Sequence, residues 1–138
     1  MQRLELVHDW LAGLFPGRPH SVTPASADAS FRRYFRVSFG DGTTHIVMDA
    51  PPEHEDCRPF VRVAGLLQRA GVHAPEILAE DLARGLLLLT DLGNTTYLDA
   101  LDASNADALF RDAIDALVKW QLASRPDALP PYDEALLR

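Results

Sequence analysis

The residues best suited to chemistry lie in one short segment of very small side chains that is followed at once by two arginines. The segment is Ser26-Ala27-Asp28-Ala29-Ser30, and Arg32 and Arg33 come after a single phenylalanine. Small side chains let backbone N–H groups come close to an anion, and an arginine fork can bond two phosphate oxygens at once. The segment could therefore bind phosphate groups, or it could be a plain surface hairpin with solvated arginines.

Other groups with chemical potential lack the arrangement that a catalytic or metal site needs. The five histidines have no metal-ligand spacing with one another or with the single cysteine, Cys57. A helix start beside Arg58 is expected to lower the pKa of that thiol. The string His54-Glu55-Asp56 reads as the solvated entry of a helix, and Tyr132-Asp133-Glu134 as a helix start. We therefore expect no catalytic residue and no metal site in this chain.

The composition excludes several classes of protein. Of the 138 residues, 47% are hydrophobic and 24% are charged, which is the ordinary balance of a globular domain. A net charge of -7 argues against binding to nucleic acid, although a few local arginines could still serve one mononucleotide. The early charges leave no apolar core for a signal peptide, and the longest aliphatic run, 86–89, is too short to span a bilayer. We expect a cytoplasmic protein with no nucleic-acid or membrane partner.

Hydrophobic periodicity predicts helices and strands that alternate along the chain. A helix is expected over residues 2–15, where Leu4, Val7, Leu11 and Leu14 recur at helical spacing. The small residues 23–30 read as a strand end plus a loop. A strand over 31–39 would place Phe31, Arg33, Phe35 and Val37 on one face, and a turn at 40–42 leads to a returning strand over 44–48.

The second half of the chain continues with helices around a further pair of strands. Asp56 is the expected N-cap of a helix that ends at Gly71, with a core face of Phe60, Val63, Ala64, Leu67 and Ala70. Short strands near 76–79 and 86–90 are joined by a turn at 83–85. Ser104 would cap a last long helix whose buried side is Phe110, Ala113, Ile114, Leu117 and Trp120. A linker over 126–131 leads to a helix start over 132–138. The chain is therefore expected to be α+β, with a mostly antiparallel sheet.

This order of elements and three strings resemble the N-terminal lobe of the aminoglycoside phosphotransferase and choline kinase family, which shares its fold with protein kinases. The strings are 26–37, SADASFRRYFRV; 46–52, IVMDAPP; and 86–93, LLLLTDLG. The chain looks closest to bacterial members that phosphorylate the anomeric hydroxyl of N-acetylmuramate and N-acetylglucosamine. The resemblance implies a protein-kinase-like N-lobe of about five strands over residues 1–92. It also implies a hinge and the first helices over 93–138, leading into a C-lobe that this chain lacks.

The resemblance assigns roles to residues at two places. It implies that the loop 26–30 covers the triphosphate of ATP, with Arg32 or Arg33 turned toward it. The strand that ends at Thr90 would lead into the hinge, Thr90-Asp91-Leu92, where the Thr90 carbonyl accepts from adenine and the Leu92 N–H donates to it. Gly93 would let the chain turn.

A third position departs from the family pattern. Family members usually carry a lysine or arginine on the third strand, paired with a helix glutamate. Here that position is Asp49, or Met48 if the alignment slips by one, and the corresponding helix stretch reads Phe60-Val61-Arg62. We hypothesise a reversed pair, in which Asp49 orients Arg62 or Arg33 and the arginine contacts the phosphates. The alternative is that Asp49 only caps the turn before the prolines.

The resemblance also implies which parts of a kinase are missing. The H-x-D-x-x-x-x-N string and the acidic motif that hold the acceptor and Mg²⁺ belong to the C-lobe, so this chain alone is expected to be inactive. The leading interpretation is the ATP-binding lobe of a sugar kinase of cell-wall recycling. A non-catalytic module that binds a nucleotide or a protein, and a purely structural α+β module, are alternatives. An exposed interlobe face would favour self-association.

Overall fold

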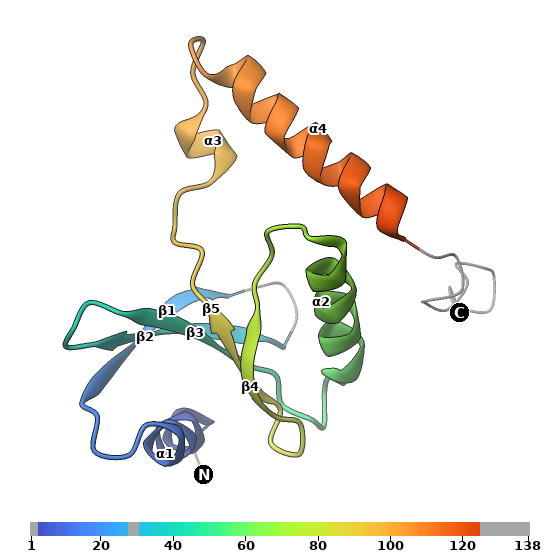
Figure 1. Ribbon diagram of the computed structural model, residues 1–138. Helices are drawn as coiled ribbons and strands as arrows, with labels where there is room; N and C mark the ends of the chain where they lie inside the picture. Colours follow the sequence, from blue (N-terminus) through green and yellow to red (C-terminus); the bar gives the residue numbers. More distant parts are fainter. Residues whose placement is uncertain (1–2, 28–30, 125–138) are drawn as a thin grey trace. The chain divides into compact units, whose positions relative to one another are not determined.

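The computed structural model describes residues 3–27 and 31–124 (Figure 1). In chain order the elements are α1 (Arg3–Leu14), β1 (His20–Ala27), β2 (Arg33–Phe39), β3 (Thr44–Asp49), α2 (Arg58–Ala70), β4 (Ile77–Asp81), β5 (Leu86–Thr90), α3 (Tyr97–Ala100) and α4 (Ala106–Ala123). Three residues of the predicted phosphate-binding segment, Asp28, Ala29 and Ser30, lie outside the described residues. So do the predicted linker 126–131 and the predicted helix start 132–138.

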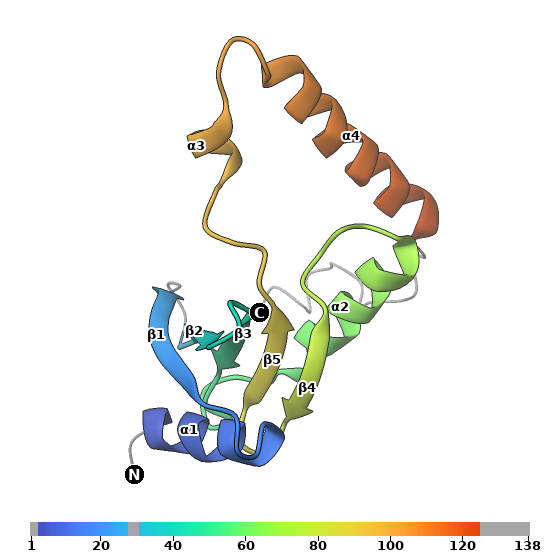
Figure 2. The same cartoon turned by 60° about the vertical axis from the view of Figure 1, so that its left-hand side comes forward.

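The five strands form one sheet in the order β1-β2-β3-β5-β4, and every neighbouring pair is antiparallel. Figure 2 shows the strands side by side in this order, with β1 and β4 at the two edges. The predicted hairpin turns are present, and each contains a glycine in the left-handed region: Gly42 has φ 88° and Gly85 has φ 72°. The prediction of an α+β, kinase-like lobe with an antiparallel sheet of about five strands is confirmed.

The first strand is longer than its residue types predict. The stretch 23–30 is expected to be a strand end plus a loop, and the strand part reaches Ala27, because Thr23, Pro24, Ser26 and Ala27 all pair with β2. Pairing to a neighbouring strand outweighs the weak intrinsic strand preference of serine and alanine. Pro24 is tolerated because β1 lies at the edge of the sheet, and the register shifts between Pro24 and Ser26.

Strand alternation divides the sheet into two apolar faces. On the first face, here called the α1 face, the strand residues pack against Val7, Trp10 and Leu11 of α1; they are Phe35, Val37, Phe39, Val47, Leu86 and Leu88. On the second face, here called the α2 face, Met48, Leu87 and Leu89 form the buried cluster, with Phe60 and Val61 of α2 packed against it. Trp10 is therefore the predicted core anchor of its helix. In β2 the predicted shared face is correct for Arg33, Phe35 and Val37, whereas Phe31 precedes the strand and is 60% exposed.

The turn between β4 and β5 is fixed to the end of β3 by backbone contacts. The Ala50 N–H donates to the Gly85 carbonyl at 2.8 Å. A Cβ atom on Gly85 would lie 1.9 Å from the Ala50 carbonyl oxygen, so only glycine fits this position. This contact closes the end of the sheet at which Asp49 lies.

The chain divides into two compact units, residues 1–64 with 75–93, and residues 65–74 with 94–138. The division passes through α2, so that 58–64 belong to the unit that contains the sheet. The predicted core face of α2 is only partly buried along its length, and Gly71, with φ 77°, ends the helix as predicted. The Gly71 N–H donates to the Gln68 carbonyl at 3.0 Å.

The second unit differs from the prediction in how its long helix is buried. None of the α4 side chains is buried: Phe110, Ala113, Ile114 and Leu117 are exposed, and Trp120 is half-buried. Ser104 is not the cap either, because Asn105 holds that position and Asp102 accepts from the N–H groups of both residues. The apolar stripe of α4 therefore faces outward within its own unit.

Candidate functional site

The predicted phosphate-binding segment begins at the paired ends of β1 and β2. Ser26 lies opposite Tyr34, and Ala27 lies opposite Arg33, in the antiparallel ladder. The two small residues are therefore strand residues held by β2. The rest of the segment, 28–30, is outside the described part of the chain, so its contact with phosphate stays a prediction.

The two arginines after this segment lie on opposite faces of the sheet. Arg33 is the first residue of β2 and shares the α1 face with Phe35. Arg32 precedes it, and its guanidinium lies over the Phe60 ring, 5.4 Å from the centroid, which places it on the α2 face. Alternation therefore gives the neighbouring arginines different partners.

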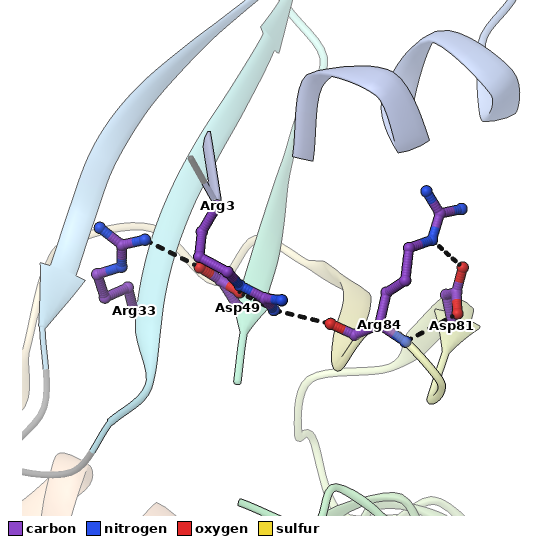
Figure 3. A network of polar contacts seen from close by, with 5 residues as sticks. All are labelled: Arg3, Arg33, Asp49, Asp81 and Arg84. Carbon is purple, nitrogen blue, oxygen red and sulfur yellow. Dashed lines mark hydrogen bonds and ion pairs between the residues drawn. The ribbon is translucent and has the colours of Figure 1, made fainter. Parts of the chain in front are cut away.

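Asp49, at the end of β3, is the centre of a polar network on the α1 face (Figure 3). Its carboxylate is fully buried and accepts from Arg3 Nε at 2.9 Å and from Arg33 Nη2 at 3.1 Å. Arg3, in the first turn of α1, also donates to the Arg84 carbonyl at 2.7 Å. Arg84 in turn is paired with Asp81. The network joins α1 to the ends of β2 and β3 and to the β4–β5 turn.

Of the two partners predicted for Asp49, the structure brings one to it. Arg33 is paired with Asp49, while Arg62 is exposed on α2 and is not among the ion-pair partners of Asp49 in the described part of the chain. The additional partner, Arg3, carries no sequence signal that links it to a residue 46 positions away. Whether Arg33, Arg62 or Asp49 takes part in nucleotide binding stays a prediction.

The third strand presents different residues to its two faces. Asp49 and Val47 face α1, whereas Met48, fully buried, and Ile46 face α2. The kinase lysine on this strand pairs with a glutamate of the following helix, so it points to the helix face of the sheet. On this strand the residues that face α2, Ile46 and Met48, carry no charge, and which of Asp49 and Met48 corresponds to the lysine stays a prediction.

A charged pair nevertheless occupies the α2 face, formed by Arg32 and Glu55. Arg32 Nε donates to Glu55 Oε2 at 2.6 Å, and the side chains are 28% and 15% exposed. The hydrogen bond to Glu55, followed by the one to Tyr34, raises the pKa of the Arg32 guanidinium above its ordinary value. Glu55 was not expected to be a site residue, because its place in a charged string before a helix reads as solvated surface.

The neighbours of Glu55 behave differently from one another. His54 is exposed and stacks on Phe31, with ring centroids 4.3 Å apart. Asp56 is exposed and accepts from the N–H of Arg58, the first residue of α2, at 3.0 Å. Cys57 is buried, and this burial raises the pKa of its thiol, so the expected lowering by the helix start is wrong.

The predicted hinge is tied to the sheet by an ion pair. β5 ends at Thr90, and the carboxylate of Asp91 accepts from Arg36 Nε at 2.6 Å and from Arg36 Nη2 at 3.1 Å. Asp91 Oδ1 also accepts from the Gly93 N–H at 2.8 Å, and Gly93 has φ 85°, as the expected turn requires. The hydrogen bonds from Arg36 hold the pKa of Asp91 well below its ordinary value. Leu92, between them, is half exposed.

The described residues hold neither a candidate metal site nor a candidate membrane span. Residues 3–27 and 31–124 contain no group of three or more histidine, cysteine or acidic side chains placed to hold a metal ion. Over the same ranges, no helix has the length and apolar character that crossing a bilayer requires.

The antiparallel sheet, with a helix after the third strand and a hinge after the fifth, defines the N-terminal lobe of a kinase-like fold. The sequence profile of the phosphotransferase enzyme family matches residues 21–138, so this chain belongs to that family.

Curated relatives of this chain carry a more specific name. It is 61% identical over 120 residues to the N-acetylmuramate/N-acetylglucosamine kinase of Pseudomonas aeruginosa, and this match covers 87% of this chain and 35% of that protein. It is 42% identical over 143 residues to the kinase of the same name from Neisseria meningitidis, covering 100% of this chain and 42% of that protein. The chain thus spans little more than a third of the length of these relatives.

Proposed function

We propose that this chain is the nucleotide-binding lobe of a kinase that transfers the γ-phosphate of ATP to the anomeric hydroxyl of N-acetylmuramate or N-acetylglucosamine. The observation that carries the proposal is the 61% identity to a kinase named for these two sugars. The family profile matches residues 21–138, which include the segment before β2, β3 and the hinge, the three places where a kinase-like lobe meets its nucleotide. The reaction would recycle cell-wall sugars in the cytoplasm.

The proposed roles of the two lobes rest on the share of the relatives' length that this chain spans. Residues 1–92 would bind ATP, and residues 93–138 would be the hinge and the first helices of a second lobe. The groups that activate the acceptor hydroxyl and hold Mg²⁺ would lie in that second lobe, where the resemblance places the H-x-D-x-x-x-x-N string and the acidic motif. The acceptor sugar would bind there too.

In the proposed complex the adenine edge meets the backbone at the hinge. The Thr90 carbonyl would accept from the adenine amino group, and the Leu92 N–H would donate to a ring nitrogen. Asp91 supports this arrangement through its side chain, because its contacts with Arg36 and the Gly93 N–H hold the segment against the sheet. A hinge held in one conformation loses less entropy when a base binds to it.

The proposal is tested by joining this chain to the remaining part of the Pseudomonas aeruginosa relative and measuring phosphate transfer from ATP. We expect transfer to N-acetylmuramate and N-acetylglucosamine, and none to the methyl glycoside of N-acetylglucosamine, whose anomeric oxygen is blocked. The 138-residue chain alone should bind ATP weakly and transfer no phosphate. Equal phosphorylation of the methyl glycoside would refute the anomeric assignment, and transfer by the chain alone would refute the division between lobes.

A further inference from the structure

The proposed function requires a group on the α2 face of the sheet that holds the inner phosphates of ATP. A kinase-like lobe holds the inner phosphates with a cation that a carboxylate orients, and this pair lies on the helix face of the sheet. In this chain the strand residue that faces α2 is Met48, which is fully buried in the apolar cluster. Asp49, the charged neighbour, faces α1, where Arg3 and Arg33 are its partners.

Only two arginines of β2 and its approach share the α2 face, and their partners distinguish them. Arg36 is bonded through two nitrogens to Asp91, at the end of β5 where the hinge begins. Arg32 lies toward the opposite end of β2, beside Tyr34, whose partner in the ladder is Met48. Arg32 therefore lies on the same face as Met48 and at the same end of the β2–β3 ladder.

Resting on the proposed function, we infer that Arg32 and Glu55 take the place of the strand lysine and helix glutamate. Arg32 contacts the α- or β-phosphate, and Glu55 orients it. Arg32 is held in one place by its 2.6 Å hydrogen bond from Nε to Glu55 Oε2 and by the Phe60 ring beneath its guanidinium. Glu55 is only 15% exposed, so this hydrogen bond is largely shielded from water. A guanidinium carries five N–H donors in a planar fork, which suits it to hold a carboxylate and phosphate oxygens together. In the usual kinase pair the cation lies on the third strand and the carboxylate lies in the following helix. Here Arg32 lies just before β2, and Glu55 lies just before α2.

The experiment separates phosphate affinity from base affinity on the 138-residue chain. Adenosine, AMP, ADP and ATP with Mg²⁺ are titrated into ¹⁵N-labelled protein, and the dissociation constants are taken from the amide chemical shifts. In the wild type, affinity should rise from adenosine to ADP. Arg32→Met should reduce the increase in affinity from adenosine to ADP by roughly tenfold or more, because the variant loses hydrogen bonds to the charged phosphates. Its affinity for adenosine should not change.

Two further variants and one control make the result specific. Glu55→Gln keeps the size of the side chain but removes its charge, so the gain should fall several-fold with adenosine affinity unchanged. Arg32→Lys keeps a charge without the fork and should restore only part of the gain. Arg58→Met removes an exposed arginine, paired with Asp56 at the start of the same helix, and should leave the whole series unchanged.

The outcomes distinguish failure of this inference from failure of the proposed function. A wild type whose affinity does not rise with added phosphates would overturn both. A wild-type gain that survives in Arg32→Met and in Glu55→Gln would overturn the pair alone. A gain lost in Arg33→Met but kept in Arg32→Met would place the phosphate contact with Asp49 and Arg33 instead. A change in adenosine affinity in both Arg32→Met and Glu55→Gln, but not in Arg58→Met, would show that the pair only stabilises the fold.

Discussion

The Asp49 carboxylate has no contact with solvent, so the arginine that joins it to α1 should contribute strongly to stability. The perturbation is Arg3→Met, which keeps the aliphatic stem of the side chain and removes the guanidinium. It leaves a buried carboxylate with Arg33, which is itself half exposed, as the remaining partner. It also leaves the Arg84 carbonyl without the donor at 2.7 Å.

The magnitude follows from the burial of the partners. Removing one partner of a fully buried ion pair costs about 3–5 kcal/mol. Here Arg3 is 23% exposed and a second arginine stays in place, so we expect a loss of about 2–3 kcal/mol in the free energy of unfolding. Asp49→Asn should also destabilise, and in the double variant the two losses should not add. The expected coupling energy is about 1.5–2.5 kcal/mol.

The assay is urea unfolding of the four proteins of this cycle, followed by the fluorescence of Trp10, which is buried between α1 and the sheet. Trp120→Phe in all four removes the signal of the other tryptophan, which lies on α4. Arg58→Met serves as the control, because its partner Asp56 is exposed and the loss of that pair should change stability little. A coupling energy below about 0.5 kcal/mol would refute the view that this network anchors α1 to the sheet.

Three other predictions concern separate parts of the chain. Because Arg36 lowers the pKa of Asp91 below the ordinary value of 3.8, Asp91→Asn should be less stable than wild type above about pH 5, and the difference should shrink as pH falls; urea unfolding between about pH 7 and pH 3 checks this, and a constant difference would contradict it. Gly85→Ala should cost at least about 2 kcal/mol by urea unfolding, from strain at positive φ and a clash with backbone; an unchanged midpoint would contradict it. The exposed stripe of α4 should make the chain self-associate, so Ile114→Glu with Leu117→Lys should lower the sedimentation coefficient at high concentration; a wild-type monomer would contradict it.

The site combines residues of two kinds, and they differ in how far sequence could reveal them. Arg32, Arg33 and the hinge could be named from local strings, because small residues, arginines and a strand followed by glycine leave a pattern within a few positions. Glu55 could not be named, since the surrounding His54 and Asp56 are exposed and only a contact 23 positions away distinguishes it. Among the described residues, Arg62 is not an ion-pair partner of Asp49, because Arg62 lies on α2 and Asp49 faces α1 on the other side of the sheet. The sequence does not show which face of the sheet a helix covers.

The sequence by itself determined which residues alternate between faces, where the hairpins turn and where α2 stops. These features depend on neighbours within a few residues: the two-residue period of a strand, and glycine at positive φ. Only the tertiary structure decided which charges meet. The pairs Arg3–Asp49, Arg32–Glu55 and Arg36–Asp91 join residues 46, 23 and 55 positions apart. Each depends on strand order and register, and on which helix covers which face. Local spacing carries no information about these, because the energy that selects them comes from burying the two faces of the sheet.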